Sequence, residues 1–304
     1  DAGAMVKVNR EPEIAVADYE RGKTLASTAI DPGSFNITVD QAKYFMFKVE
    51  DLEEWFSHIN WRSLSSDHAA YALRDAVDSD VLGYLLGMKW TGAAWAPRVA
   101  ADMPGTKADA AADDDELLAA HKLAHADFVS DADGTNDAYS IPLAPGGGTD
   151  VVSPLAVLNR FQRLLDEQNV PQENRYFVAP PSFYELLGDE NSKLMDHDFT
   201  SESEDLLRNG RVGNGMVRGF RLYKSNNLPY AGTGPATTNA AGSDTNYGYV
   251  LAGHMGAAAH VKNIVKNETM RDQDTFADIV RGLLVFGRKI IRPNSLIRAA
   301  WNFA

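Results

Sequence analysis

Alternation between apolar and polar residues changes character along the segment FNITVDQAKYFMFKV, residues 35–49. Successive side chains of a strand face opposite ways, so a half-buried strand should alternate regularly. From Asn36 to Lys43 the apolar signal is thin and falls on one side only, whereas from Tyr44 to Val49 both sides are apolar apart from Lys48. The pattern predicts an extended arm that is mostly solvated over its first half and covered on both sides over its second.

An earlier strand is predicted to pair with this arm. Residues 5–8 (MVKV) alternate as a strand, and the turn signal Asp31-Pro32-Gly33-Ser34 lies between the two extended runs. Proline presets one turn dihedral and glycine accepts a positive one. The first fifty residues are therefore expected to form a long two-stranded excursion with an irregular tip. A lone ribbon is marginal in water unless something packs on it, so this segment raises the question of a partner.

Helical periodicity is strongest between Ser65 and Leu86, with Ser65 or Ser66 as N-cap and Gly87 just past the end. Its apolar positions recur every four residues and form one stripe, which comprises Ala69, Leu73, Val77, Val81 and Leu85. Three shorter helices are predicted over residues 115–128, 153–169 and 182–187. In the second of these, Ser153-Pro154 supplies an N-cap and the proline that is favoured at the first helical position.

The remaining ordered segments are predicted to be strands, because short apolar runs are bounded by glycine, proline or charged turns. They lie at residues 176–178, 220–223, 247–251, 257–265 and 279–291, with a charged turn at 268–274.

Composition narrows the class of protein. The 304 residues, 44% hydrophobic and 23% charged, suit a soluble globular protein of one large domain or two modest ones. Absence of cysteine excludes disulfides, thiolate chemistry and cysteine-ligated metal sites. No apolar run approaches the roughly 18 residues of a membrane span, and the first residues, DAGAMVKVNR, lack the apolar stretch of a signal peptide. Because the chain opens on Asp1 rather than Met, we expect N-terminal residues to precede it.

Charge argues against a protein that grips nucleic acid. The formal net charge is −13, whereas affinity for nucleic acid comes mainly from Lys and Arg that neutralise phosphates. Two local clusters stand out: a basic stretch (Arg281, Arg288, Lys289, Arg292 and Arg298) and an acidic one (Asp113, Asp114, Asp115 and Glu116). We interpret both as solvated faces.

Candidate metal sites are incomplete. His121 and His125 are four apart on a predicted helix, a spacing by which two imidazoles can share a metal, but Lys122 stands where a metalloprotease helix needs glutamate. An exposed polar face is the simpler interpretation. A calcium loop around Gly134 fails because Val129 stands at the first ligand position and Ser140 at the last. An acidic surface turn is predicted there instead.

Nucleotide and nucleophile motifs are also incomplete. Gly213 and Gly215 are followed by Gly219, one residue late for a dinucleotide loop, and the run leads into a strand instead of opening a helix. Residues 146–148 (GGG) lack the Lys-Ser/Thr of a P-loop, and no Gly-x-Ser-x-Gly elbow is present. We interpret both glycine runs as turns, and we assign no catalytic, cofactor-binding or metal-binding residue and no cofactor.

Four blocks together resemble a known family. They are ITVDQAKYFMFKVEDLE (37–53) with the helix end DAVDSDVLG (75–83), RFQRLLDEQNVPQENRYFVAPPSFYELLGD (160–189), NGRVGNGMVRGFRLYKSNNLP (209–229) and FADIVRGLLVFGRKIIRPNSLI (276–297). In this order they resemble the major capsid proteins of tailed bacteriophages, over nearly the whole chain.

The resemblance implies an α+β fold of the Hong Kong ninety-seven type, shared with herpesvirus and encapsulin shells. Residues 1–50 would form the extended β-hairpin loop, without the N-terminal arm that usually precedes it. The resemblance implies that this loop packs on a neighbouring subunit and on no other part of its own chain. Residues 51–149 would form the peripheral domain with its long spine helix and a variable region, residues 150–255 the axial domain, and residues 256–304 the return strands of the peripheral domain. No Lys and Asn pair for covalent cross-linking is identified, so none is predicted.

The function that this resemblance implies is structural, not enzymatic. Copies of the chain would assemble as pentamers and hexamers into an icosahedral head around double-stranded DNA, without sequence-specific DNA binding and without a membrane. The protein would then be found in the virion and be assembled in the host cytoplasm, with scaffolding, portal and decoration proteins as candidate further partners. Two alternatives remain: an encapsulin-like nanocompartment shell, and a soluble α+β enzyme that uses a metal at His121 and His125.

Overall fold

The computed structural model describes residues 5–9, 21, 34–56, 61–92, 94–97, 117–128, 140–145, 147, 151–189, 216–232 and 246–303. The chain divides into two compact units. Unit 1 comprises Asp1–Ser63 and His260–Lys289, and unit 2 comprises Leu64–Ala259 and Ile290–Ala304. The connections between the units therefore run along one long helix and two long strands.

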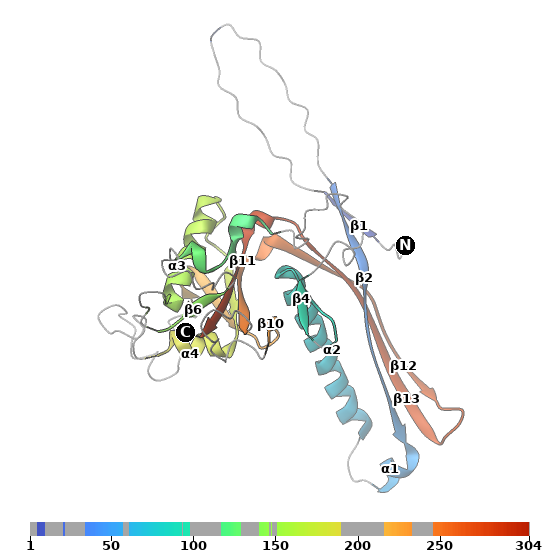
Figure 1. Cartoon of the computed structure of the whole chain (residues 1–304). Coiled ribbons are helices and arrows are strands. Elements are labelled where there is room, and N and C mark those ends of the chain that lie inside the picture. Colours follow the sequence, from blue (N-terminus) through green and yellow to red (C-terminus); the bar gives the residue numbers. More distant parts are fainter. Residues whose placement is uncertain are drawn as a thin grey trace. The chain divides into compact units, whose positions relative to one another are not determined.

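Unit 1 is built on a four-stranded sheet in the order β1-β2-β13-β12 (Figure 1). Its strands are β1 (Met5–Asn9), β2 (Ser34–Glu50), β12 (Ala258–Arg271) and β13 (Ala277–Ile290). The short helix α1 (Asp51–Phe56) follows β2 directly. β1 pairs antiparallel with the start of β2, from Met5 opposite Thr38 to Asn9 opposite Ser34. The predicted pairing of the two extended runs is confirmed.

The prediction that this ribbon packs on no other part of its own chain is wrong for its second half. β2 pairs antiparallel with β13 from Glu50 opposite Ala277 to Val39 opposite Gly287. A second expectation also fails: Tyr44 is 77% exposed and Met46 64% exposed, so only one side of this half is covered within the chain. Apolar residues do lie on both sides of this half, but the side that carries Tyr44 and Met46 is not covered by the described part of this chain.

The long helix of the chain is α2 (Trp61–Leu85). It begins four residues before the predicted start, so Ser65 and Ser66 lie inside it and neither is its N-cap. Gly87 follows the helix end as predicted, with a φ of 71° that suits glycine. The apolar stripe is deeply buried only toward the C-terminal end, at Val77 and Leu85, whereas the earlier positions of the stripe are half-buried.

Unit 2 contains an eight-stranded sheet among the described residues, in the order β5-β14-β11-β7-β9-β8, with β6 beside β14 and β10 beside β11. Its strands are β5 (Lys122–Leu123), β6 (Ile141–Leu143), β7 (Arg175–Ala179), β8 (Met216–Val217), β9 (Phe220–Lys224), β10 (Tyr230–Ala231), β11 (Tyr247–His254) and β14 (Leu296–Phe303). β11 is antiparallel to both β14 and β7, whereas β5 and β6 are parallel to β14 and β9 is parallel to β7. A small hairpin, β3 (Met88–Trp90) and β4 (Trp95–Pro97), forms a separate two-stranded sheet.

Two helices contribute to the main core of unit 2. α3 (Pro154–Glu167) begins as predicted, with the Ser153 side chain accepting a hydrogen bond from the backbone N–H of Ala156 at 3.3 Å. α4 (Pro181–Leu187) ends at Gly188, as the glycine there predicted. Fully buried aromatic side chains of the helices and sheet contact one another in this core: Phe161, Phe177, Phe183 and Trp301. Burying such rings supplies a large hydrophobic stabilisation.

The predicted helix over residues 115–128 is wrong. The described part of this segment forms η2 (Ala119–His121), β5 and η3 (His125–Asp127). Lys122 and Leu123 pair with Arg298 and Ala299 of β14, and Asp127 closes a tight turn by accepting a hydrogen bond from the N–H of Ala124 at 2.9 Å. Pairing with a distant strand overrides the local helical preference.

The predicted turn after β12 also shifts. Residues 268–271 continue the strand to Arg271, and the reversal occupies residues 272–276. The backbone N–H of Asp272 donates to the carbonyl of Ala277 at 2.9 Å and closes the reversal. η4 (Met255–Ala257) precedes β12, and η5 (Pro293–Ser295) precedes β14.

Candidate interaction surface

The sheet of unit 1 has two unlike faces. Tyr44 lies opposite Leu283 and Met46 opposite Arg281 in the pairing of β2 with β13, so these four side chains share one face. Tyr44, Met46 and Leu283 are 77%, 64% and 36% exposed. We call the surface formed by Tyr44, Met46, Arg281, Leu283, Lys266 and Glu268 the open face. It combines large apolar side chains with charges, as interface patches typically do.

β12 completes the open face with charged side chains. Arg281 donates from Nε (2.9 Å) and Nη2 (2.6 Å) to Oε2 of Glu268, which places Glu268 on the same side as Met46. Lys266, two residues from Glu268 on the same strand, also faces this side, and it forms no ion pair with another described residue. A hollow of about 440 Å³ lies on this surface, lined by the six open-face residues with Phe45 and Gly282.

The opposite face is packed more closely. Phe45 lies against Gly282: a Cβ built there would come within 3.0 Å of the ring. Phe45 stacks with Phe47 at 6.2 Å between ring centroids, and Leu284 and Phe286 on this face are buried. The packing on this side fixes the strands that display the open face.

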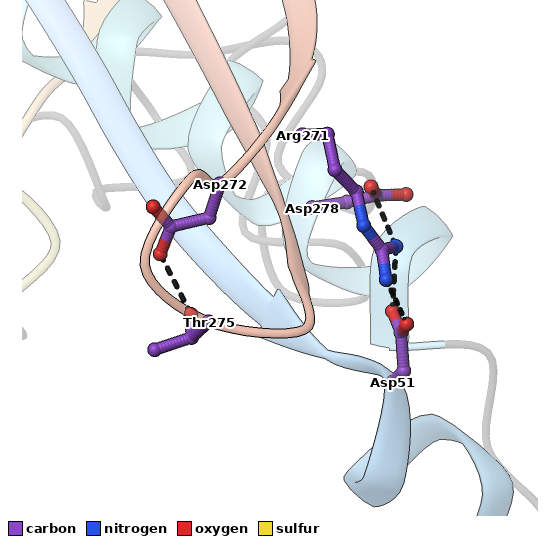
Figure 2. Close-up of polar contacts among 5 residues, drawn as sticks. All are labelled: Asp51, Arg271, Asp272, Thr275 and Asp278. Atoms are coloured by element: carbon purple, nitrogen blue, oxygen red, sulfur yellow. Dashed lines mark hydrogen bonds and ion pairs between the residues drawn. The ribbon is translucent and has the colours of Figure 1, made fainter.

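A polar cluster fastens the turn between β12 and β13 to the start of α1. Figure 2 shows the Arg271 guanidinium between two carboxylates, bonded to Oδ1 of Asp51 at 2.9 Å and to Oδ1 of Asp278 at 3.2 Å, with a second bond to Oδ2 of Asp51. The hydrogen bond to Asp51 raises the pKa of Arg271. The backbone N–H of Asp51 also donates to the carbonyl of Phe276 at 3.0 Å. The turn and α1 are thereby held together.

Asp272 organises the turn itself. Its carboxylate lies 2.6 Å from Nζ of Lys48 and accepts hydrogen bonds from the Thr275 hydroxyl (2.7 Å) and from the backbone N–H of Asp274 (3.3 Å). The bonds from Lys48, Thr275 and Asp274 hold the pKa of Asp272 far below its usual range. Because all of these donors favour the ionised carboxylate, the turn is built for a charged Asp272.

Three aromatic side chains project from this end of unit 1. Trp55 and Phe276 are each 84% exposed, and Phe56 is 72% exposed. The rings of Trp55 and Phe56 meet edge to face at 6.2 Å. We call Trp55, Phe56 and Phe276 the aromatic tip. The aromatic tip was not predicted from the sequence. The signal that could have revealed it is the pair of adjacent aromatic residues in the acidic segment DLEEWF, residues 51–56, because an amphipathic helix that packs on a core does not need two adjacent aromatic residues.

His121 and His125, the candidate metal pair, are neither exposed nor on one helix. Both are buried, at 1% and 6% exposure. Nδ1 of His121 lies 2.9 Å from the carbonyl oxygen of Leu296, whereas Nε2 of His125 is buried with no hydrogen-bond partner among the described residues. Among the described residues no group of three or more His, Asp or Glu side chains is placed to hold a metal. The prediction of an exposed polar face here is wrong.

Several other candidates from the sequence lie outside the described residues. They are the calcium-like loop up to residue 139, the acidic cluster at 113–116 and the glycines at 213 and 215. Gly219 and Arg218 form the two-residue turn between β8 and β9, with φ values of 79° and 51°, so the predicted turn is confirmed at this position. Of the basic stretch, Arg281 pairs with Glu268, and Arg298 donates to the carbonyl of Leu86.

Comparison with known proteins identifies the fold. No protein-family model and no curated protein matches the chain. The structure is similar to a chain of Mycobacterium phage Che8, at 22% identity and a TM-score of 0.67, with 98% of this chain and 84% of that chain covered.

Two further similar structures are chains of phage capsids. A chain of the capsid of Ralstonia phage GP4 aligns at 12% identity and a TM-score of 0.67, with 100% of this chain and 85% of that chain covered. A chain of the mature capsid of bacteriophage PhiM1 aligns at 16% identity and a TM-score of 0.61, with 98% of this chain and 82% of that chain covered. The chain has a phage capsid fold. The predicted α+β capsid fold is therefore confirmed. Within the described part of the chain, no helix has the length and apolarity needed to cross a bilayer.

Proposed function

We propose that this chain is the major capsid protein of a tailed phage and that its function is self-assembly into the icosahedral head. The observation that carries this proposal is the likeness of almost the whole chain to chains of two phage capsids, those of Ralstonia phage GP4 and bacteriophage PhiM1. The open face and the aromatic tip support it independently, because a protein that works alone rarely leaves so many large apolar side chains in water. On this proposal the work of the molecule lies in surfaces that contact other copies.

The proposal extends to the parts of the chain and to its surroundings. Residues 1–50 would form the extended loop, 51–149 and 256–304 the peripheral domain, and 150–255 the axial domain, with the final strand β14 paired into the sheet of the axial part. The particle would be built of pentamers and hexamers and would be found in the virion after assembly in the host cytoplasm. Scaffolding, portal and decoration proteins are candidate additional partners.

The acidic composition fits a container for DNA. With a net charge of −13, the inner wall would repel phosphate and leave the packaged double-stranded DNA free to slide, without sequence-specific contacts. A structural role also accounts for the lack of an assigned catalytic residue. The proposal therefore includes that the chain is not an enzyme.

Electron microscopy of the purified protein, together with sedimentation, tests the assembly. We expect closed shells of uniform diameter. A persistent monomer of 33.2 kDa under conditions that span salt and pH would refute the proposal. Particles purified from the native source should contain DNA, whereas an enzyme as contents would indicate an encapsulin-like compartment.

A further inference from the structure

Unit 1 displays two exposed features of opposite shape and charge, namely the open face and the aromatic tip. The aromatic tip projects Trp55, Phe56 and Phe276, all at least 72% exposed. The open face is hollowed instead, over about 440 Å³. Pockets that enclose small molecules measure about 300–1,000 Å³, so the hollow has room for more than one aromatic ring. A projecting apolar feature and an apolar hollow on one molecule are complementary between two copies.

The charges around the two features are complementary as well. The tip is surrounded by an excess of acidic side chains, with Glu50, Asp51, Asp272, Asp274 and Asp278 against Lys48 and Arg271. The carboxylate of Asp274 forms no ion pair with another described residue. On the open face Lys266 and Arg281 outnumber Glu268, and Lys266 is the cation left over after Arg281 has paired. In a chain whose net charge is −13, a locally basic apolar hollow favours an acidic partner surface.

We propose that the aromatic tip of one copy docks into the open face of a second copy, with Lys266 of the open face beside the acidic turn that contains Asp274. This inference rests on the proposed self-assembly and names the surfaces that meet. Three aromatic side chains bury about 150–250 Å² each, so the tip contributes about 450–750 Å², a large part of the roughly 800 Å² that each partner gives to a standard interface. Trp, Tyr and Arg, which are typical of interface hot spots, are present on the two surfaces.

Cysteine pairing between copies tests the contact directly, because the chain has no cysteine of its own. Copies that carry only Phe276→Cys are mixed with copies that carry only Met46→Cys, assembled, oxidised and run on a non-reducing gel. We expect a disulfide-linked dimer with one copy of each kind. The matched control is Val265→Cys, which is 67% exposed and lies on the opposite face of β12 from Lys266. Docking should favour the 46–276 link over the 265–276 link by roughly a hundredfold, since a docked pair is held at a far higher effective concentration than free copies.

Several outcomes would overturn the proposal. If shells form and position 276 links mainly to position 276 of another copy, the tips meet each other instead. If shells form and position 276 links equally to positions 46 and 265, or to neither, the tip does not dock on the open face. In each of these cases the proposed capsid function stands. If no shell forms with the wild-type chain, it is the capsid proposal that fails.

Charge reversal gives a second, independent test. Lys266→Asp and Asp274→Lys should each weaken assembly, because each places like charges together at the contact. The double variant should restore assembly. Both substituted side chains are exposed, so circular dichroism should show folded subunits in all three variants. Single variants that assemble like the wild type, or a double variant no better than the worse single one, would contradict the contact.

Discussion

The carbonyl oxygen of Thr38 occupies the space that a side chain at position 287 would need. A Cβ built on Gly287 would lie within 3.0 Å of this oxygen and of backbone on the neighbouring strand. The approach occurs where the register of β2 and β13 shifts between Phe286 and Gly287. Glycine therefore allows the two backbones to approach closely at this irregularity in the pairing.

Gly287→Ala is expected to destabilise the subunit by about 1–3 kcal/mol, since the obstacle is backbone and cannot swing aside. Denaturant unfolding of the unassembled chain measures this change. Gly256→Ala is a suitable control, because the nearest atom to its Cβ is a ring nitrogen of His254 at 3.2 Å, and a side chain can adjust. Equal stability of Gly287→Ala and wild type would show that the two strands do not approach so closely.

Arg175 joins the end of α3 to the start of β7. Its side chain is 2% exposed, lies 2.7 Å from Oδ1 of Asp166, and donates to the backbone carbonyls of Val170 and Pro171. Arg175→Met should lower the free energy of unfolding by about 2–4 kcal/mol, because buried acceptors lose a charged donor. Arg175→Lys should recover only part of this loss, because lysine lacks the planar fork.

Arg163, on α3, provides the matched comparison for Arg175 at the start of β7. It pairs with Glu167 at 3.1 Å, and both side chains are more than half exposed. Arg163→Met should change stability by no more than about 0.5 kcal/mol. If the two methionine variants unfold alike, the buried contacts of Arg175 do not stabilise the fold in the way argued.

The two buried histidines should differ in their tolerance of substitution. His121 donates from Nδ1 to the carbonyl of Leu296, whereas Nε2 of His125 is buried and has no partner in the part of the chain that the structure describes. His121→Phe should cost about 1–3 kcal/mol, because it leaves a buried acceptor unsatisfied. His125→Phe should be neutral or stabilising, because it removes a buried polar atom whose desolvation is not compensated by a hydrogen bond to a described residue. Thermal unfolding of both variants at neutral pH measures the difference, and the reverse order of stability would contradict this account.

Local signals sufficed for elements whose ends are determined by neighbouring residues. Ser153 and Pro154 start α3, Gly188 ends α4 and Gly87 follows α2 because caps and prolines act within one turn. The β1–β2 pairing followed from the alternation in the two extended runs, whereas the turn signal at residues 31–33 lies outside the described residues. For these elements, the sequence pattern and the physical cause lie close together along the chain.

Other features depend on residues far along the chain, and local patterns could not reveal them. Lys122 and Leu123 are strand residues because β14 lies beside them, more than 170 positions later. The exposure of Tyr44 and Met46 depends on which other part of the chain covers their face of the sheet. Periodicity identifies an apolar face, but it does not show what covers that face. The resemblance to capsid proteins predicted the fold. It did not predict the open face or the aromatic tip, because each combines residues that are more than 200 positions apart in the sequence and meet only in the folded unit 1.

Acid should loosen the turn between β12 and β13. Lys48, Thr275 and the N–H of Asp274 depress the pKa of Asp272, so its contribution to stability is fully present above the pKa of about 3.9 that an unfolded aspartate has. This contribution falls as the pH drops below that value toward the lower folded pKa. Raising the pH above 5 should change nothing at this site, because the carboxylate is ionised in both states.

Asp272→Asn removes the titrating group while preserving its size, so it isolates this effect. The stability difference between wild type and this variant should be constant from about pH 5 to 8 and should shrink below about pH 4. Denaturant unfolding at a series of pH values measures it, and hydrogen exchange of the amides at 272–278 localises it. Asp274→Asn is the control, because its carboxylate has no partner among the described residues. A difference that grows toward acid pH would mean that Asp272 is not held in its ionised form by Lys48.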